Sequence, residues 1–365
     1  MRLVGLQVRD WRNLEAADVA TDARVVVFHG DNAQGKTNLL EAVWLLATLR
    51  SFREARPANW VRHGAEGALV RGDVIGESGR RRLEWRLEGP QRHLALDGTP
   101  NPALETWFQL LRAVLLCPED INLIRGEPAE RRRYLDRAEF TARPDYLSLA
   151  RDYRRAVQQK AALLRRGRVT PAELEPWSDR LSTLGARLSL RRQHLLAELD
   201  APFTEMHGFI SGIRARVGLR LRGIGAVASD LEGLEAGLRE AQHRLVTEEI
   251  NQARVLVGPH RDDLDVHIDG RLARSFASQG QARTLVLALK LAEVEAARQR
   301  GTTPVFLLDD LGGELDAGRR ARLVERLGSL DGQVWITTTH PELLGPLPLG
   351  DTCLWRVSGG AVEAG

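Results

Sequence analysis

Residues 30 to 37 have the composition and spacing of a phosphate-binding loop. The segment reads Gly30-Asp31-Asn32-Ala33-Gln34-Gly35-Lys36-Thr37 and fits G-x-x-x-x-G-K-[ST] at every fixed position. Its glycines let the backbone curl so that successive N–H groups face phosphate oxygens. In such a loop the lysine neutralises the β- and γ-phosphates of a nucleotide, and the last hydroxyl serves Mg²⁺. A plain glycine-rich turn is the alternative, which the complete match disfavours.

A pair of carboxylates follows a short apolar run late in the chain. Val305 to Leu308 has the pattern of a buried strand, and Asp309 and Asp310 come directly after it. In P-loop ATPases the first such carboxylate holds Mg²⁺, so Asp309 is the candidate metal ligand together with Thr37. Asp310 stands where ABC-type ATPases usually have a glutamate that activates water. Two solvated acids at a strand end are the alternative, and the phosphate loop argues against them.

The segment Phe276 to Gln281 resembles the ABC signature Leu-Ser-Gly-Gly-Gln. Ser278, Gly280 and Gln281 match the pattern, whereas Gln279 replaces the first glycine. A serine hydroxyl and free N–H groups at the start of a long helix favour an anion. Alone, S-x-G-Q is more often a helix N-cap, but its place shortly before Asp309 favours the signature.

Two smaller elements complete this set. Gly313-Glu314-Leu315-Asp316 resembles an ABC D-loop, with glycine in place of the usual serine. His340 follows the apolar segment Val334 to Thr338, where ABC ATPases place a switch histidine near the γ-phosphate. A lone histidine at a strand end is often incidental, so both interpretations of His340 stay open.

The surrounding elements have the order that a phosphate site requires. Strands are expected at Leu3 to Val8 and Arg24 to Phe28, and a helix from Lys36 to Leu49. Residues 68–100 read as an antiparallel meander, with turns at 77–80 and 97–98. Residues 128–250 read as mostly helical and arginine-rich, and Gln281 to Arg300 as one helix.

The net charge and the composition narrow the classes of protein to which this sequence can belong. The net charge is +3, so any nucleic-acid binding depends on local patches; Arg131 to Arg133 and Arg165-Arg166 are the candidates. Only Lys36, Lys160 and Lys290 are lysines among 52 basic residues, which suggests that chemistry requires Lys36. The two cysteines predict buried thiols in a reducing cytoplasm. No apolar run reaches the roughly 20 residues that a bilayer requires. No membrane partner is expected, although the missing segment alone does not exclude a transporter subunit, which is often a separate chain.

Together the motifs resemble those of the RecF family of bacterial recombination-repair proteins. The likeness includes segments outside the ATPase motifs, namely Ser51-Phe52-Arg53, Pro118-Glu119-Asp120, Pro128 to Asp136, and Gly258-Pro259-His260-Arg261-Asp262-Asp263. It extends from residue 3 to at least residue 340. The segments 128–136 and 258–263 are the more family-specific ones, although their residues also suit a helix start and a salt-bridged turn.

The resemblance implies an α/β P-loop ABC-type ATPase head with a β-rich ATPase lobe and a mostly helical second lobe. The ATPase lobe is expected at 1–120 and 285–365, and the helical lobe, which ends in the signature, at 121–284. It further implies ATP and Mg²⁺ as cofactors, weak DNA-dependent ATP hydrolysis, and an ATP-dependent homodimer. Expected partners are single- and double-stranded DNA with gaps, RecR, and indirectly RecA. The expected nucleotide contacts are Gly30, Asn32, Ala33, Gln34, Gly35, Lys36, Thr37, Asn38, Ser278, Gly280 and Gln281, and the catalytic residues are Asp310, Lys36 and His340.

Three other functions share some of these motifs. A nucleotide-binding subunit of an ABC transporter would have the same ATPase motifs, but the family-like segments outside them argue against it. A nuclease with an ATPase head would need a carboxylate-rich metal site after residue 340, and residues 341–365 leave little room for one. A DNA clamp without turnover shares every motif, and only a hydrolysis assay separates it.

Overall fold

The protein is described by a computed structural model, which covers residues 1–77, 79–224, 228–310, 315–345 and 351–365. The chain divides into two compact units. The first unit contains residues 1–120, 208–213 and 290–365, and the second contains residues 121–207 and 214–289.

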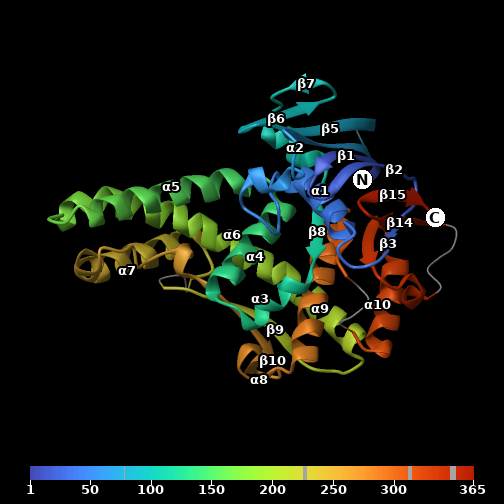
Figure 1. Ribbon diagram of the computed structural model, residues 1–365. Helices are drawn as coiled ribbons and strands as arrows, with labels where there is room; N and C mark the ends of the chain where they lie inside the picture. The colour runs from blue at the N-terminus through green and yellow to red at the C-terminus, as the bar shows by residue number, and fades with distance from the viewer. Residues whose placement is uncertain (78, 225–227, 311–314, 346–350) are drawn as a thin grey trace. The chain divides into compact units, whose positions relative to one another are not determined.

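A mostly parallel sheet forms the centre of the first unit (Figure 1). Its order is β15-β14-β3-β13-β12-β8, and only the edge strand β15 runs antiparallel to its neighbour. The strands are β3 (Val25–His29), β8 (Ala113–Leu116), β12 (Val305–Leu308), β13 (Val334–Thr338), β14 (Thr352–Ser358) and β15 (Ala361–Ala364). All residues of β12 and β13 are buried, as parallel strands covered on both faces require. Because parallel strands end at the same edge, β3, β12 and β13 bring the segments after them together.

An antiparallel sheet is the second layer of this unit. Its order is β2-β1-β4-β5-β6-β7, with β1 (Arg2–Trp11), β2 (Leu14–Ala20), β4 (Gly67–Gly76), β5 (Gly79–Glu88), β6 (Gln91–Leu96) and β7 (Thr99–Pro100). The predicted meander at 68–100 is confirmed; Ser78, in its first turn, lies outside the described residues. Strand β2 was not predicted, because its alanines and acids have low β-propensity and its buried positions do not alternate strictly.

Helix α1 (Lys36–Thr48) packs against strands of both sheets. Ten of its 13 residues are buried, so the helix is apolar on nearly every side. This burial fixes the N-terminus of α1, where the phosphate-binding loop ends. The remaining helices of the unit are α2 (Leu104–Leu110), α10 (Ala317–Ser329) and the 3₁₀ turns Pro57–Trp60, Pro118–Ile121 and Pro341–Leu344.

The second unit is mainly helical. It contains α3 (Asn122–Arg125), α4 (Pro128–Ala142), α5 (Tyr146–Arg165), most of α6 (Pro171–Ser211), α7 (Leu231–Gln252), α8 (Ala273–Phe276) and a 3₁₀ turn at Pro259–Arg261. A small sheet with the order β11-β10-β9 joins β9 (Val217–Arg222), β10 (Asp263–Ile268) and β11 (Arg271–Leu272). Helices α5, α6 and α7 share one apolar core and form an elongated arm (Figure 1). The helical prediction for 128–250 is confirmed, except that β9 interrupts it.

Helix α9 (Gln279–Gln299) begins in the second unit and ends in the first. It starts two residues earlier than predicted. Among the described residues, no helix combines the length and the apolar composition that crossing a bilayer requires. Both cysteines are free, but only Cys117 is buried; Cys353 is half-buried, contrary to the prediction, because β14 lies near the sheet edge.

Candidate nucleotide-binding site

The phosphate-binding loop has the backbone that its glycines predict. Gly30 and Gly35 have positive φ angles of 145° and 116°, and Ala33 between them has φ 63°. A Cβ on Gly30 would lie 2.2 Å from the carbonyl oxygen of Val357 in β14, so no larger residue fits there. The loop therefore curls tightly between the end of β3 and the start of α1.

Lys36 lies inside this loop. Its Nζ donates hydrogen bonds of 2.7 Å to the carbonyl oxygens of Gly30 and of Asp31, and the residue is 8% exposed. Burial lowers the pKa of Lys36, while the nearby carboxylates of Asp310, Asp309 and Asp31 oppose this shift. A phosphate at the loop would give this partly desolvated ammonium a charged partner.

Asp309 and Thr37 meet as the sequence predicts. The Thr37 hydroxyl donates a 2.8 Å hydrogen bond to Oδ1 of Asp309, and the two residues are 272 positions apart. Thr337 at the end of β13 donates to the same oxygen at 2.6 Å and accepts from the backbone N–H of Asp310 at 2.8 Å. Sequence reasoning missed Thr337. The sequence feature that could have identified it is a hydroxyl residue near the carboxyl end of a buried strand.

The chemistry of these groups fits Mg²⁺. Burial raises the pKa of Asp309, hydrogen bonds from Thr337 and Thr37 oppose the shift, and the carboxylates of Asp310 and Glu119 raise it further. A divalent cation would relieve this accumulation of negative charge. Hydroxyl and carboxylate oxygens are the ligands that Mg²⁺ prefers, so Thr37 and Asp309 are the residues that would hold it.

Asp310 is exposed and has a left-handed backbone with φ 55°. Aspartate and asparagine occur in this conformation several times more often than other side chains. The backbone thus gives a physical reason for aspartate at a position where ABC-type ATPases usually have glutamate.

Ser278 caps helix α9. The Ser278 hydroxyl accepts a 3.2 Å hydrogen bond from the backbone N–H of Gln281, and the Gln281 amide oxygen accepts from the N–H of Ser278 at 2.8 Å. This reciprocal pair is a capping box. Arg125 fixes the preceding residue by donating to the carbonyl oxygen of Ala277 at 2.8 Å. Ser278 and Gln281 are exposed, and Gly280 is half-buried at the second position of the helix.

The two smaller motifs are His340 and the D-loop segment. His340 is exposed, follows β13 by two residues, and its Nδ1 lies 2.9 Å from the carboxylate of Glu342. Gly313 and Glu314 of the D-loop lie outside the described residues. Asp316 caps α10 by accepting from the N–H of Arg319 at 2.9 Å.

A series of hydrogen bonds beside the phosphate-binding loop was not predicted from the sequence. Arg53 donates to the Asn38 side chain at 2.9 Å, Asn38 donates to Asn13 at 2.7 Å, and Asn13 donates to the carbonyl oxygen of Ala33 at 3.3 Å. Gln34 leaves the loop on another side, where its Oε1 accepts from the N–H of Gly359 at 2.5 Å. Asn32 is exposed. Asn38 therefore lies in the site, but its side chain is occupied by protein groups.

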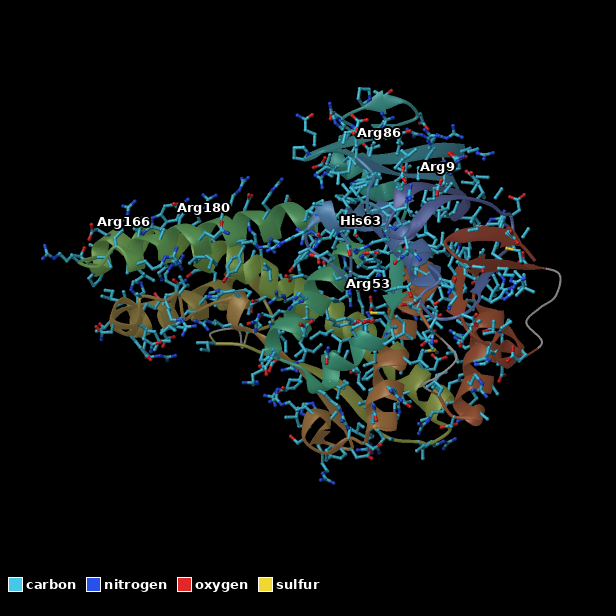
Figure 2. The ribbon with its side chains drawn as sticks, viewed as in Figure 1. Arg9, Arg53, His63, Arg86, Arg166 and Arg180 are labelled. Carbon is cyan, nitrogen blue, oxygen red and sulfur yellow. The ribbon has the colours of Figure 1, made fainter. Side chains whose placement is uncertain are left out.

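The arginine runs proposed to contact DNA are of two kinds. Arg131 is 3% exposed and its Nε lies 2.5 Å from Asp263, so its proposed role in DNA contact was wrong. Arg132 is partly buried and donates to the carbonyl oxygen of Asp262, whereas Arg133 is exposed and pairs with Glu130. Arg165 and Arg166 are exposed at the end of α5, and Figure 2 shows Arg166 at the tip of the arm.

The segment 258–263 holds the second unit together. Arg192 is fully enclosed and donates to the carbonyl oxygen of Pro259 and to the carboxylates of Asp262 and Asp136, at 2.8, 2.8 and 2.7 Å. A Cβ on Gly258, which has φ 125°, would lie 2.3 Å from the hydroxyl of Tyr153. The segment thus serves packing of α4, α5, α6 and β10.

Comparison with known proteins gives the family. A RecF described as "DNA replication and repair protein" from Anaeromyxobacter sp. (strain Fw109-5) is 40% identical over all of this chain and 99% of its own length. The chain belongs to the RecF family. The RecF of Geobacter sulfurreducens is 38% identical, with 99% of each chain covered. No protein-family model matches the chain.

Solved structures agree with this family and fold. The recombination mediator protein RecF-ATPrS in the RecFOR pathway has a TM-score of 0.89, with 28% identity over 100% of this chain and 98% of its own. A RecF-ATP structure of the same pathway has a TM-score of 0.88, also at 28% identity, and covers 99% and 97%. An Smc head bound to a domain of ScpA has a TM-score of 0.59 at 13% identity over 100% and 97%, and shows the fold alone. The predicted fold class, an α/β P-loop ABC-type ATPase head, is confirmed.

Proposed function

We propose that this RecF-family chain is an ATP-dependent DNA-binding protein of recombinational repair and replication. The observation that carries the proposal is the meeting of Thr37, Asp309 and Lys36 around one loop, with the Thr37 hydroxyl 2.8 Å from the Asp309 carboxylate. ATP in RecF structures that cover nearly the whole chain supports the choice of nucleotide. Membership of a family described as DNA replication and repair proteins argues against the transporter alternative.

Each residue of the site has a distinct proposed task. The loop N–H groups and Lys36 bind the phosphates, and Thr37 and Asp309 hold Mg²⁺, which supplies charge neutralisation when bound. Asp310 accepts the proton of the attacking water and orients it toward the γ-phosphate. Thr337 positions the Asp309 carboxylate and the backbone of Asp310, because its hydroxyl donates to the former and accepts from the N–H of the latter. His340 contacts the γ-phosphate after leaving Glu342.

The assembly and partners belong to the same proposal. ATP joins two subunits, with Lys36 and Asp309 of one and Ser278, Gly280 and Gln281 of the other around each nucleotide. Hydrolysis is slow and releases the dimer, so ATP limits the residence time on gapped DNA. RecR is the proposed direct partner, since the solved relatives act in the RecFOR pathway, and RecA is loaded indirectly.

The test measures phosphate release with and without gapped duplex DNA for the wild type and for Asp310→Asn. Asparagine is compatible with the positive φ at residue 310, so the variant should fold and bind ATP as before. Turnover should fall at least about 100-fold, because residue 310 no longer has a carboxylate to accept the proton. DNA should raise the wild-type rate. Wild-type turnover in Asp310→Asn would refute its catalytic assignment, and a rate indifferent to DNA would refute the DNA dependence.

A further inference from the structure

Eight arginines without ion-pair partners lie on the hairpin of α5 and α6. All are exposed, and no salt bridge to them occurs within the described part of the chain. They are Arg151, Arg154, Arg155, Arg165, Arg166, Arg168, Arg180 and Arg187. We call these eight residues the arm arginines.

Four arginines of the antiparallel sheet are different. Arg9 lies 2.7 Å from Asp18, Arg80 and Arg82 lie 3.0 and 2.7 Å from Asp73, and Arg86 lies 2.8 Å from Glu84. Carboxylates of the sheet itself neutralise these four cations, whereas the arm arginines have no acid partner among the described residues. Exposed arginines without acid partners also occur elsewhere in the part of the chain that the structure describes, for example Arg214, Arg216 and Arg220, but eight of them lie on this one hairpin.

The charge of the arm is divided between its helices. Residues 146–190 contain nine Lys and Arg against four Asp and Glu, a net charge of +5. Helix α7, which shares the same apolar core, contains two Arg against five Glu, a net charge of −3. The fully buried pair of Lys160 and Glu249, 2.5 Å apart, joins the two sides within the core. Within the arm, the hairpin of α5 and α6 is therefore basic, whereas α7 is acidic.

The arginines of α5 lie on one face of the helix. At 3.6 residues per turn, Arg151, Arg154, Arg155 and Arg165, together with the C-cap residue Arg166, fall within about 120° of arc, and from first to last they span about 22 Å. Arg168 extends this row just beyond the helix, and Arg180 and Arg187, two turns apart, belong to α6. In Figure 2, Arg166 lies at the tip of the hairpin and Arg180 lies farther back along it. The row is long enough to follow about six base pairs of duplex DNA, at 3.4 Å per pair.

We propose that the arm arginines bind the phosphate backbone of duplex DNA. The inference rests on the DNA binding proposed above and assigns its surface. Arginine forks bind phosphate oxygens in bidentate fashion, and cations without acid partners need not break an ion pair first. A protein partner would require apolar anchors, and a single strand would require aromatic side chains for stacking. In the described residues of this hairpin no large apolar side chain is exposed; Tyr146 and Tyr153 are buried and Trp177 is half-buried.

The test compares two quadruple variants that remove the same charge. The arm variant is Arg151→Gln, Arg155→Gln, Arg165→Gln and Arg166→Gln; glutamine is about as good a helix former as arginine, and no ion pair is lost. The control variant is Arg9→Gln, Arg80→Gln, Arg82→Gln and Arg86→Gln on the sheet. Fluorescence anisotropy measures the Kd for a labelled blunt duplex of about 30 base pairs over a series of salt concentrations, and thermal melting verifies the fold.

The arm variant should weaken duplex binding by about 10- to 100-fold at moderate salt and reduce the slope of log K against log[salt] by two to four, or about 0.9 per lost phosphate contact. The control variant should change the Kd less than about threefold. Equal loss in both variants would show an effect of net charge alone and overturn the proposal. If the wild type binds DNA and the slope of the arm variant is unchanged, this surface is overturned but the proposed function stands. An acidic protein would then be the partner of the arm. With ATP present, a wild type that does not bind the duplex overturns the proposed surface, and one that binds neither the duplex nor gapped DNA overturns both.

Discussion

At the scale of single residues, the three lysines are informative. Lys36, Lys160 and Lys290 are 8%, 0% and 1% exposed, in a chain whose other 49 basic residues are all arginine. Each ammonium lies among several oxygens, such as the carbonyls of Gly30 and Asp31 around Lys36. A compact ammonium can point its three donors to such positions, whereas a planar guanidinium is larger and has fixed donor directions. The sequence suggested this constraint for Lys36 only, because burial of the other two depends on packing.

Lys36→Arg tests this size constraint. The substitution keeps the charge but adds a planar fork to a loop in which Lys36 is 8% exposed. We expect ATP affinity to fall at least about 100-fold, equivalent to about 2.7 kcal/mol, with loss of turnover. Equilibrium binding of a fluorescent ATP analogue measures the change. Arg56→Lys, an exposed exchange in the same unit, controls for the swap of cation type, and wild-type ATP affinity in Lys36→Arg would disprove the proposed role of the ammonium.

At the scale of secondary structure elements, features that depend on local sequence patterns were predicted, whereas contacts between residues far apart in the chain were not. Strands β12 and β13 and the N-terminus of α1 were predicted to the residue, since continuous apolar runs and the glycine loop are local features. The contacts of Arg192 were not, because they join residues 56 and 70 positions apart in the chain. The same holds for Arg131, which belongs to a run of three arginines and is nevertheless buried against Asp263.

Arg192→Met tests whether these contacts hold α4, α6 and the 258–263 segment together. Removing the guanidinium leaves the carboxylate of Asp262, which is 1% exposed, without its cation. Since an uncompensated buried charge is costly, we expect a loss of about 3–5 kcal/mol in the free energy of unfolding. Urea denaturation measures it. Arg133→Met, at a position that is 72% exposed, should change stability by less than about 0.5 kcal/mol, and similar losses in both variants would contradict the assignment.

His260 predicts a pH dependence in the same segment. Burial lowers its pKa from 6.5 to about 4, and its Nδ1 lies 2.8 Å from the Tyr153 hydroxyl. The folded state therefore keeps the imidazole neutral, while the unfolded chain takes up a proton below pH 6.5. The stability that this neutral ring provides is complete above pH 6.5 and is lost as the pH falls toward 4.

His260→Gln should remove this loss while keeping a hydrogen-bonding group for Tyr153. Between pH 7 and pH 5 the wild type should lose about 1–2 kcal/mol more than the variant. Urea titrations at both pH values measure the difference, and His194→Gln, at an exposed position of α6, controls for the removal of one imidazole. Parallel pH profiles of wild type and His260→Gln would show that His260 does not titrate in this way.

At the scale of the whole molecule, the motifs of the site belong to two compact units. Gly30 to Thr37, Asp309 and His340 belong to the first unit, and Ser278 to Gln281 belong to the second. Composition and local pattern predicted many of the elements within each unit, whereas the joint binding of one ATP by the two sets of residues belongs to the proposed function. The proposed dimer, in which each nucleotide binds between two subunits, is therefore a hypothesis that needs its own experiment.

Complementation between two inactive variants tests the composite site. Lys36→Met removes the phosphate cation, and Ser278→Arg puts a large cation where the helix cap presents a small hydroxyl to the solvent. In a C₂ dimer each variant alone should be inactive, because both of its sites lack one component. Equal mixing should form mixed dimers for half of the protein, and each mixed dimer joins the intact Lys36 of one subunit to the intact Ser278 of the other. Phosphate release should therefore recover to at most about a quarter of the wild-type rate, and should depend on protein concentration since the dimer must form. Ser278→Arg that hydrolyses ATP alone at the wild-type rate, at every protein concentration, would show that one subunit suffices.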